Sequence, residues 1–284
     1  MESVTRVHTV RERIAEWRRE GHKVAFVQTM GSLHKGHLAL IAEAQARAPR
    51  VAVSVFVNPL QFGPDEDFSR YPRKIAADKT LLEDVGASLM FVPSAFEMYP
   101  TGFERTTKVD VPELSQILEG QAHPTFIEGF ATVSTKLLQI VQPDVAVYGE
   151  KDFQQLVIIR RLIADLCMPV EIVSVPVVRE HDGLAYGTRN RHLSSRDRNF
   201  ASRLHDALKV CRRRLIDGER NFAAAAEAGF EELDRGGLHR EYFSVRQALD
   251  LMPPRADSRD LVVLAAARLG LSRLVDCLRV TLAS

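Results

Sequence analysis

The chain is poor in cysteine. Only three occur among its 284 residues, at positions 167, 211 and 277, and no two of them form a CxxC pair. An odd number of widely spaced cysteines argues against a disulfide framework. All three stand among apolar residues, so we expect Cys167, Cys211 and Cys277 to be small buried side chains rather than reactive thiols.

Long apolar runs and an excess of charge of either sign are also missing. The longest apolar stretches, such as VAVSVFV at 51–57, have the length of a strand and fall well short of a bilayer span. The N-terminus lacks the apolar core of a signal peptide, so we expect a soluble, cytoplasmic protein. The 38 Lys and Arg residues balance 37 Asp and Glu residues, leaving a formal charge of +1. This balance gives no global field that would attract nucleic acid or an anionic membrane.

Alternating strand and helix patterns extend from the N-terminus to about residue 178. The strands are expected at 24–31, 50–58, 88–93, 144–149 and 170–178, and the helices at 9–20, 38–47, 74–85, 129–141 and 151–166. A charged loop is expected at 64–73, and a short helix at 112–120 within the weakly patterned region 97–128. Strands that are apolar on both faces are typical of a parallel sheet covered by helices. The pattern therefore predicts an α/β fold, a Rossmann-like doubly wound parallel sheet with right-handed crossovers.

The remainder of the chain differs in character. Residues 179–198 are polar and rich in arginine and glycine, as in a linker or a mobile phosphate-binding loop. Helices are then expected at 196–216 and 219–233, followed by strands at 240–251, 260–270 and 274–280. We therefore predict two domains, residues 1–180 and a smaller C-terminal α+β domain of residues 181–284.

The most informative segment is the turn between the first predicted strand and its helix. It contains Gly31 and Gly36, with His34 and His37 three residues apart in an HxGH pattern. A turn from a parallel strand into a helix leaves backbone N–H groups at the positive end of the helix dipole, where phosphate binds. Imidazoles add hydrogen-bond donors that titrate near neutral pH. The pattern predicts a nucleotide-phosphate site.

Two other interpretations of the histidines remain open. They could ligate a metal ion, although no third His, Cys or carboxylate follows at the spacing of a zinc site. They could also be ordinary residues of a helix start that cap the helix and face solvent.

Other polar side chains follow the ends of further predicted strands. Asn58 and Gln61 follow the second strand, at the edge where open α/β sheets bind ligands. The fourth strand ends in glycine, and Lys151 at that corner could reach phosphates while Asp152 caps the next helix. A solvated lysine and a simple cap explain the same residues equally well. For Asp78, one turn into its helix, a structural role and a cofactor contact are both open.

Five ordered segments together resemble the pantothenate synthetase family, the ligases that join pantoate and β-alanine in coenzyme A biosynthesis. They are TMGSLHKGH, SVFVNPLQF with the following YPR, KLLQIVQPD, GEKDFQQL and VPVVREHDGLAYGTRNRHLS. The resemblance spans most of residues 20–195. An HxGH motif alone would indicate only the nucleotidyltransferase superfamily, whereas five motifs in order indicate this family.

The resemblance implies an ATP-dependent ligase that works in two steps. The carboxylate of (R)-pantoate attacks the α-phosphate of ATP and releases pyrophosphate. The amine of β-alanine then displaces AMP from the pantoyl adenylate and forms an amide. The family also implies that Mg²⁺ accompanies ATP, that the C-terminal domain acts as a lid, and that the enzyme is a homodimer.

The functional residues of the family carry over to matching positions of this chain. The catalytic residues implied in this way are His34, His37, Lys151 and Arg189, with His37 as proton donor. The implied ATP-binding residues are Met30, Gly31, Ser32, Leu33, His34, Lys35, Gly36, His37, Gly149, Glu150, Lys151, Asp152, Val178, Tyr186, Gly187, Thr188 and Arg189. The residues implied for pantoate and β-alanine are Gln61, Gln155 and Asn58, and Asp78 matches an acidic position near the metal.

Three segments depart from the family pattern. Gln28 stands where the family usually has proline, residues 125–128 replace Gly-His-Phe-Arg, and residues 186–188 replace Met-Ser-Ser. The last change leaves Gly187 without a hydroxyl donor to phosphate. We therefore expect an active enzyme that turns over more slowly or binds ATP more weakly.

Two further hypotheses compete with the ligase. One is a different adenylyl or cytidylyl transferase with the same phosphate turn, which Gln61, Gln155 and the appended domain argue against. The other is a binding protein that kept the fold and lost turnover, which the altered loop at 186–188 motivates.

Overall fold

The computed structural model of the chain describes residues 1–63, 68–270 and 272–283. The chain divides into two compact units. The first consists of residues 1–149 and 158–175, and the second of residues 150–157 and 176–284. The second unit therefore takes in a short stretch, 150–157, that the sequence assigns to the N-terminal domain.

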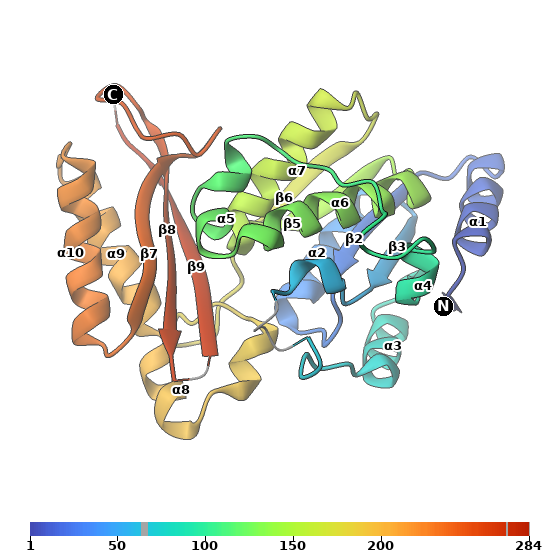
Figure 1. The fold of residues 1–284 in the computed structure, drawn as a ribbon, viewed down its shortest axis with the longest axis horizontal. Helices are drawn as coiled ribbons and strands as arrows, with labels where there is room; N and C mark the ends of the chain where they lie inside the picture. The colour runs from blue at the N-terminus through green and yellow to red at the C-terminus, as the bar shows by residue number, and fades with distance from the viewer. Residues whose placement is uncertain (64–67, 271, 284) are drawn as a thin grey trace. The chain divides into compact units, whose positions relative to one another are not determined.

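In the described part of the chain, the first unit is built on a six-stranded parallel sheet (Figure 1). Its strands, in spatial order, are β1 (Glu2–Val4), β4 (Leu89–Phe91), β3 (Arg50–Val55), β2 (Val24–Thr29), β5 (Val145–Gly149) and β6 (Glu171–Val175). Apart from the edge strand β1, this order is that of a doubly wound Rossmann-like sheet, so the predicted fold class is confirmed. β3 and β5 flank β2, which puts the topological switch point at the carboxyl ends of β2 and β5.

Helices cover both faces of this sheet. The helices of this unit are α1 (Val7–Arg19), α2 (Lys35–Arg47), α3 (Ile75–Asp84), α4 (Ala95–Met98), α5 (Glu119–Ala122), α6 (Pro124–Val141) and the part of α7 (Phe153–Asp165) from residue 158 onward. Val27, Val53 and Val147 lie on one face and pack in a buried cluster with Ile41 of α2. Side chains alternate along a strand, so the buried Phe26 lies on the other face, where α6 contacts both β2 and α1.

Most of the elements predicted for this unit are present with shifted ends, and three expectations were wrong. The strand β1 was missed. The helix expected from residue 129 begins at Pro124, which occupies the first helical position, where proline is favoured. The helix expected from residue 38 begins at Lys35, so His37 belongs to its first turn.

Smaller differences concern the strand ends and one short helix. The first two strands end at Thr29 and Val55 rather than at 31 and 58. The short helix expected at 112–120 is a 3-10 turn, η2 (Leu114–Gln116), followed by the first residues of α5. Residues 64–67 of the expected charged loop lie outside the described residues.

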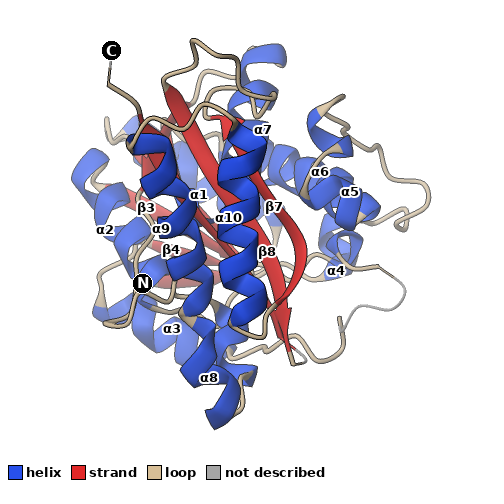
Figure 2. Cartoon of the chain, turned by 90° about the vertical axis from the view of Figure 1, so that its left-hand side faces the viewer, coloured by secondary structure: helices blue, strands red, loops and turns tan. Residues whose placement is uncertain are grey.

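The second unit is an α+β structure, as expected. Its described residues include a three-stranded antiparallel sheet of β7 (His239–Gln247), β8 (Asp260–Leu269) and β9 (Ser272–Thr281), in that order. Figure 2 shows α9 (Arg203–Ile216) and α10 (Phe222–Arg235) side by side against this sheet. Leu208 and Cys211 of α9 and Leu233 of α10 join Val263 of β8 in one buried cluster.

Two expectations for this unit are corrected. The single helix expected at 196–216 is two helices, α8 (Ser195–Ala201) and α9, which meet at Ser202. The strand expected at 240–251 ends at Gln247, and a turn follows.

The cysteines are unpaired, as expected, but only two of them are buried. Cys211 and Cys277 are buried, whereas Cys167, just past the end of α7, is exposed. Among the described residues, none of the helices has the length and apolar character needed to cross a membrane.

Candidate active site

The turn between β2 and α2 needs left-handed backbone at two consecutive residues. Gly31 has a φ of 82° and Ser32 a φ of 51°. A Cβ atom at position 31 would lie 2.9 Å from Val55 Cγ1 and 3.0 Å from Asp78 Oδ2. Glycine satisfies both the backbone conformation and the close approach, so this position does not accept a side chain without rearrangement.

The carboxylate of Asp78 holds this turn from α3. Its Oδ2 accepts a hydrogen bond from the backbone N–H of Ser32, and its Oδ1 accepts one from Leu33, both at 2.8 Å. The Asp78 residue is only 3% exposed. Hydrogen bonds to an ionised acceptor are stronger than neutral ones, so these contacts fix the turn firmly. Asp78 thus has the structural role that the sequence left open.

His34 and His37 form a reciprocal cap at the start of α2. His34 is the N-cap, and its Nδ1 accepts a hydrogen bond from the N–H of Gly36 at 3.2 Å. Nδ1 of His37 accepts one from the N–H of His34 at 3.3 Å, and the ring centroids are 4.0 Å apart. The histidines therefore do cap the helix, but both are half-buried rather than exposed to solvent.

The cap also defines the chemistry of the two imidazoles. Because Nδ1 accepts a hydrogen bond in both rings, the neutral form of each carries its proton on Nε2. Nε2–H is a hydrogen-bond donor, and it is on a different nitrogen from the one used for capping. Together with the backbone N–H groups and dipole of the helix start and the exposed Lys35, these donors suit an anionic ligand.

The side chain of Gln61 is hydrogen-bonded to that of Asn58. Asn58 is fully buried, and its Nδ2 donates to Gln61 Oε1 at 3.3 Å and to the carbonyl of Gly129 at 3.0 Å. Its Oδ1 accepts from the hydroxyl of Tyr99 at 2.8 Å. Both amide hydrogens of Asn58 are thus used inside the protein. We expect Asn58 to act through Gln61 rather than by touching a substrate.

Two predicted ATP-binding segments lie side by side in the second unit. Lys151 belongs to the 3-10 turn η3 (Glu150–Asp152), and its Nζ is 3.9 Å from the carboxylate of Asp152. A Cβ atom at Gly187 would lie 3.7 Å from Cε of Lys151. The structure therefore brings the loop at 186–189 next to the lysine of the η3 turn.

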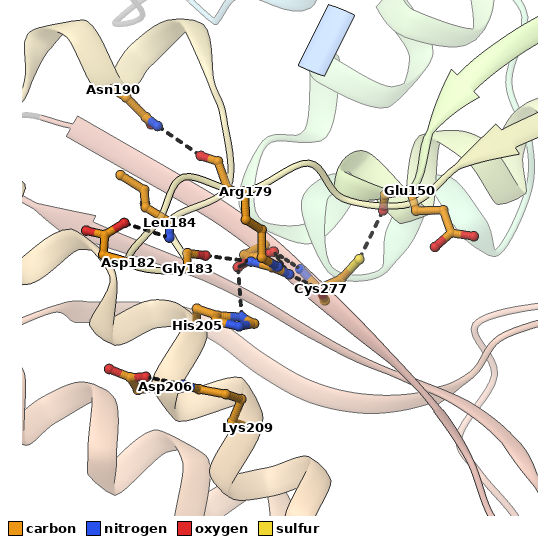
Figure 3. A network of polar contacts seen from close by, with 12 residues as sticks. Glu150, Arg179, Asp182, Gly183, Leu184, Asn190, His205, Asp206, Lys209 and Cys277 are labelled. Atoms are coloured by element: carbon orange, nitrogen blue, oxygen red, sulfur yellow. Dashed lines mark hydrogen bonds and ion pairs between the residues drawn. The ribbon is translucent and has the colours of Figure 1, made fainter. Parts of the chain in front are cut away.

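This loop is tied to its own base by backbone contacts. The N–H of Tyr186 donates to the carbonyl of Val178 at 3.0 Å. Asn190 closes the other end, because its N–H donates to the carbonyl of Gly187 and its Nδ2 to that of Ala185, the latter at 2.9 Å (Figure 3). Val178, expected to contact adenine through its backbone, uses its carbonyl to anchor the loop.

The predicted site residues are divided between the two units. The first unit carries residues 30–37, Asn58, Gln61, Asp78 and Gly149, and the second carries residues 150–152, Gln155, Val178 and 186–189. Sequence reasoning missed the supporting residues Tyr99 and Gly129. Their contacts with Asn58 join positions 41 and 71 residues apart, and no local pattern marks such pairs.

The family model for pantoate-beta-alanine ligase matches residues 2–279. The chain belongs to the pantoate–β-alanine ligase family. A pantothenate synthetase of Pseudomonas entomophila is 48% identical over 276 residues, covering 97% of this chain and 96% of that protein. One from Azotobacter vinelandii is 47% identical over 277 residues, covering 98% of each.

Solved structures of the family agree with the fold. The pantothenate synthetase from Thermus thermophilus has a TM-score of 0.91 at 41% identity, over 98% of this chain and 99% of that one. The pantoate-beta-alanine ligase from Francisella tularensis, solved in a complex with beta-gamma ATP and β-alanine, has a TM-score of 0.81 at 28% identity. The match covers 97% of that chain and 98% of this one. As a pantoate–β-alanine ligase, the chain is an ATP-dependent enzyme.

Two departures from the ligase family pattern have a visible structural outcome. Glu128, where the family often has arginine, forms an ion pair with Lys108 at 2.8 Å, so this position carries the opposite charge. Gln28, where the family usually has proline, accepts a hydrogen bond from the hydroxyl of Tyr148 at 3.4 Å. Burial raises the pKa of Tyr148, which keeps the phenol protonated as a donor.

Among the residues that the structure describes, no group of three or more His, Cys, Asp or Glu side chains is arranged to hold a metal ion. Both carboxylate oxygens of Asp78 accept from backbone N–H groups, and both Nδ1 atoms of the histidine pair do so as well.

Proposed function

We propose that this ligase makes pantothenate from (R)-pantoate, β-alanine and ATP through a pantoyl adenylate. The observation that carries the proposal is the reciprocal histidine cap, which fixes the His34 and His37 rings at the start of α2, the positive end of the helix. Family membership supports the reaction, and the position of the cap at a helix start supports phosphate binding there.

In the first step, a carboxylate oxygen of pantoate attacks the α-phosphorus of ATP and the bond to pyrophosphate breaks. The attack brings one anion towards another, so the site must neutralise charge and align the reacting atoms. We assign His34, His37, Lys151 and Arg189 to the phosphates. Through its Nε2–H, His37 donates to the departing pyrophosphate.

In the second step, the amine of β-alanine attacks the acyl carbon of the adenylate. The bond from this carbon to the phosphate oxygen breaks, AMP leaves with that oxygen, and the amine loses a proton as the amide forms. We assign Gln61 and Gln155 to pantoate, with Gln61 bordering the β-alanine position. The acyl phosphate is easily hydrolysed, so the site must also exclude water.

Magnesium belongs to the substrate in this proposal. We propose that it enters with ATP and neutralises phosphate charge, rather than occupying a site made of protein carboxylates. Asp78 contributes to the reaction by shaping the turn at Ser32 and Leu33, which presents the helix start to the phosphates.

We further propose that the enzyme acts in the cytoplasm as a homodimer. The expected dimer rests on the family resemblance of the sequence. Light scattering coupled to size-exclusion chromatography tests the dimer. We expect a mass of twice 31.8 kDa, and a mass of 31.8 kDa would contradict the proposal.

The proposal is tested by measuring AMP formation from ATP and magnesium with pantoate and β-alanine each present or omitted. We expect sustained AMP release only when pantoate and β-alanine are both present. His37→Ala should lower the rate at least about tenfold, because general acid catalysis usually contributes more than that. Arg47→Ala is the control, since it removes an exposed cation from the last turn of the same helix and leaves the cap in place.

Other results would redirect the proposal. ATP binding without AMP formation would support the non-catalytic hypothesis. Pyrophosphate release with another acceptor, and none with pantoate, would support a different nucleotidyltransferase.

A further inference from the structure

The second unit contains an almost completely buried carboxylate that has no role in the proposed reaction. Asp276, on β9, is 2% exposed. It receives two hydrogen bonds from the guanidinium of Arg179, from Nη1 to Oδ2 at 2.6 Å and from Nη2 to Oδ1 at 2.9 Å (Figure 3). Acidic side chains are almost never this buried unless they are paired, and a bidentate pair also fixes orientation.

Arg179 stands at the base of the loop that carries residues 186–189. It forms an isolated β-bridge with Ala185, and its Nη1 also donates to the carbonyl of Gly183 at 3.0 Å. The loop begins directly after that bridge. A single guanidinium therefore fastens both limbs of the loop base to the carboxylate on β9.

Cys277, the next residue of β9, reaches the other ATP-binding segment. Its Sγ donates to the carbonyl of Glu150 at 3.0 Å, and its own carbonyl accepts from Nη2 of Arg179 at 3.0 Å. Burial raises the pKa of this thiol well above its usual value, so it remains a protonated donor. Glu150 begins the η3 turn that contains Lys151.

We propose that Asp276 and Cys277 are positioning residues, which hold the loop at 186–189 and the turn at 150–152 in fixed relation and thereby set the affinity for ATP. Both residues are buried, so they act through Arg179 and Glu150 and not by touching the nucleotide. The proposal rests on the proposed function, because it takes the two segments as phosphate-binding.

The chain offers a matched pair of thiols for the test. Cys277 and Cys211 are both buried cysteines of the second unit, but Cys211 lies in the apolar cluster of α9. Alanine at either position removes the same atoms from a packed interior, which lowers stability. Only Cys277→Ala also removes the donor to Glu150, and Cys277→Ser restores a donor.

We would measure the KM for ATP, the KM for pantoate and the melting temperature for Cys277→Ala, Cys277→Ser and Cys211→Ala. We expect the KM for ATP to rise about threefold to tenfold in Cys277→Ala, as for one lost hydrogen bond. The KM for pantoate should stay within about twofold. Cys277→Ser should recover most of the ATP affinity, and Cys211→Ala should keep it while losing stability.

Two results would overturn the proposal. One is an unchanged KM for ATP in Cys277→Ala. The other is an equal rise in Cys211→Ala, because the effect would then follow general destabilisation.

Amide hydrogen exchange on the ligand-free enzyme separates this proposal from the proposed function. If the wild type made no AMP, the proposed function would fail while exchange still reported on positioning. Faster exchange over 150–152 and 185–190 in Cys277→Ala, but not in Cys211→Ala, would support the positioning role. Equal exchange in both variants would overturn it. Asp276→Asn, which keeps the shape but not the charge, should accelerate exchange at 185–190 further.

Discussion

At the scale of residues, a single carboxylate supports the turn between β2 and α2. Asp78 accepts from two consecutive backbone N–H groups, at Ser32 and Leu33, and an unsatisfied buried N–H is costly. The same position in the sequence matches an acidic residue near the metal in the family. The contacts show that Asp78 supports the turn, and the metal contact stays a prediction.

Asp78→Asn separates these two roles. The amide would present its NH₂ group to one of the two backbone N–H donors, so we expect a loss of about 1–3 kcal/mol in the free energy of unfolding without magnesium. Urea unfolding in metal-free buffer measures this. Asp84→Asn, at the exposed end of the same helix, is the control. Unchanged stability together with a weakened magnesium dependence of activity would instead make Asp78 a metal ligand.

Gly187 is a second residue at which the effect of a substitution can be predicted. Its φ of −158° is ordinary extended backbone, so a side chain is allowed there. A Cβ atom would lie 3.2 Å from Oδ1 of Asn190, which must yield by a few tenths of an ångström. Restoring the hydroxyl in Gly187→Ser should raise kcat/KM for ATP by about threefold to tenfold. Gly187→Ala is the control, and a gain shared by both variants, or no gain, would refute the explanation.

At the scale of elements, the position of Gln61 depends on how closely α6 approaches the turn that carries it. This turn is η1 (Pro59–Gln61), and a Cβ atom at Gly129 of α6 would lie 2.2 Å from the carbonyl oxygen of Leu60. Glycine inside a helix is normally a weakness, since alanine is favoured there by about 1 kcal/mol. The close packing reverses that preference.

We therefore expect Gly129→Ala to destabilise the enzyme by about 1–3 kcal/mol, the usual cost of overpacking, and to raise the KM for pantoate. Ser134→Ala is the control on the same helix, because the buried Ser134 hydroxyl has no hydrogen-bond partner among the described residues. Chemical denaturation and steady-state kinetics report the two effects. A stabilised Gly129→Ala with normal KM would show that α6 does not constrain Gln61.

The elements also show which patterns could be predicted from the sequence. The passage from β2 through the glycine turn into α2 was predictable, because strand composition, glycines and helix periodicity agree there. The start of α6 was not, because Pro124 reads as a breaker until it is known to occupy the first turn. The strand β1 has three residues, too few to show alternation.

At the scale of the whole molecule, the family and its reaction could be predicted from five ordered motifs, whereas the supports of the site could not. Asp276 and Arg179 are 97 positions apart, and Asn58 and Gly129 are 71 positions apart. Such pairs form only when the chain folds, and each is one polar residue among many in the sequence. The sequence thus indicates the residues expected to meet substrate, and the structure shows how several of them are held.

The proposed reaction requires that pantoate is activated as an adenylate. The most direct test uses pantoate labelled with ¹⁸O in both carboxylate oxygens, with mass spectrometry of the products after complete reaction. The account predicts one ¹⁸O atom in AMP and one in the amide carbonyl of pantothenate, because the oxygen that attacks the α-phosphorus leaves with AMP. Unlabelled AMP, or label in inorganic phosphate, would contradict it.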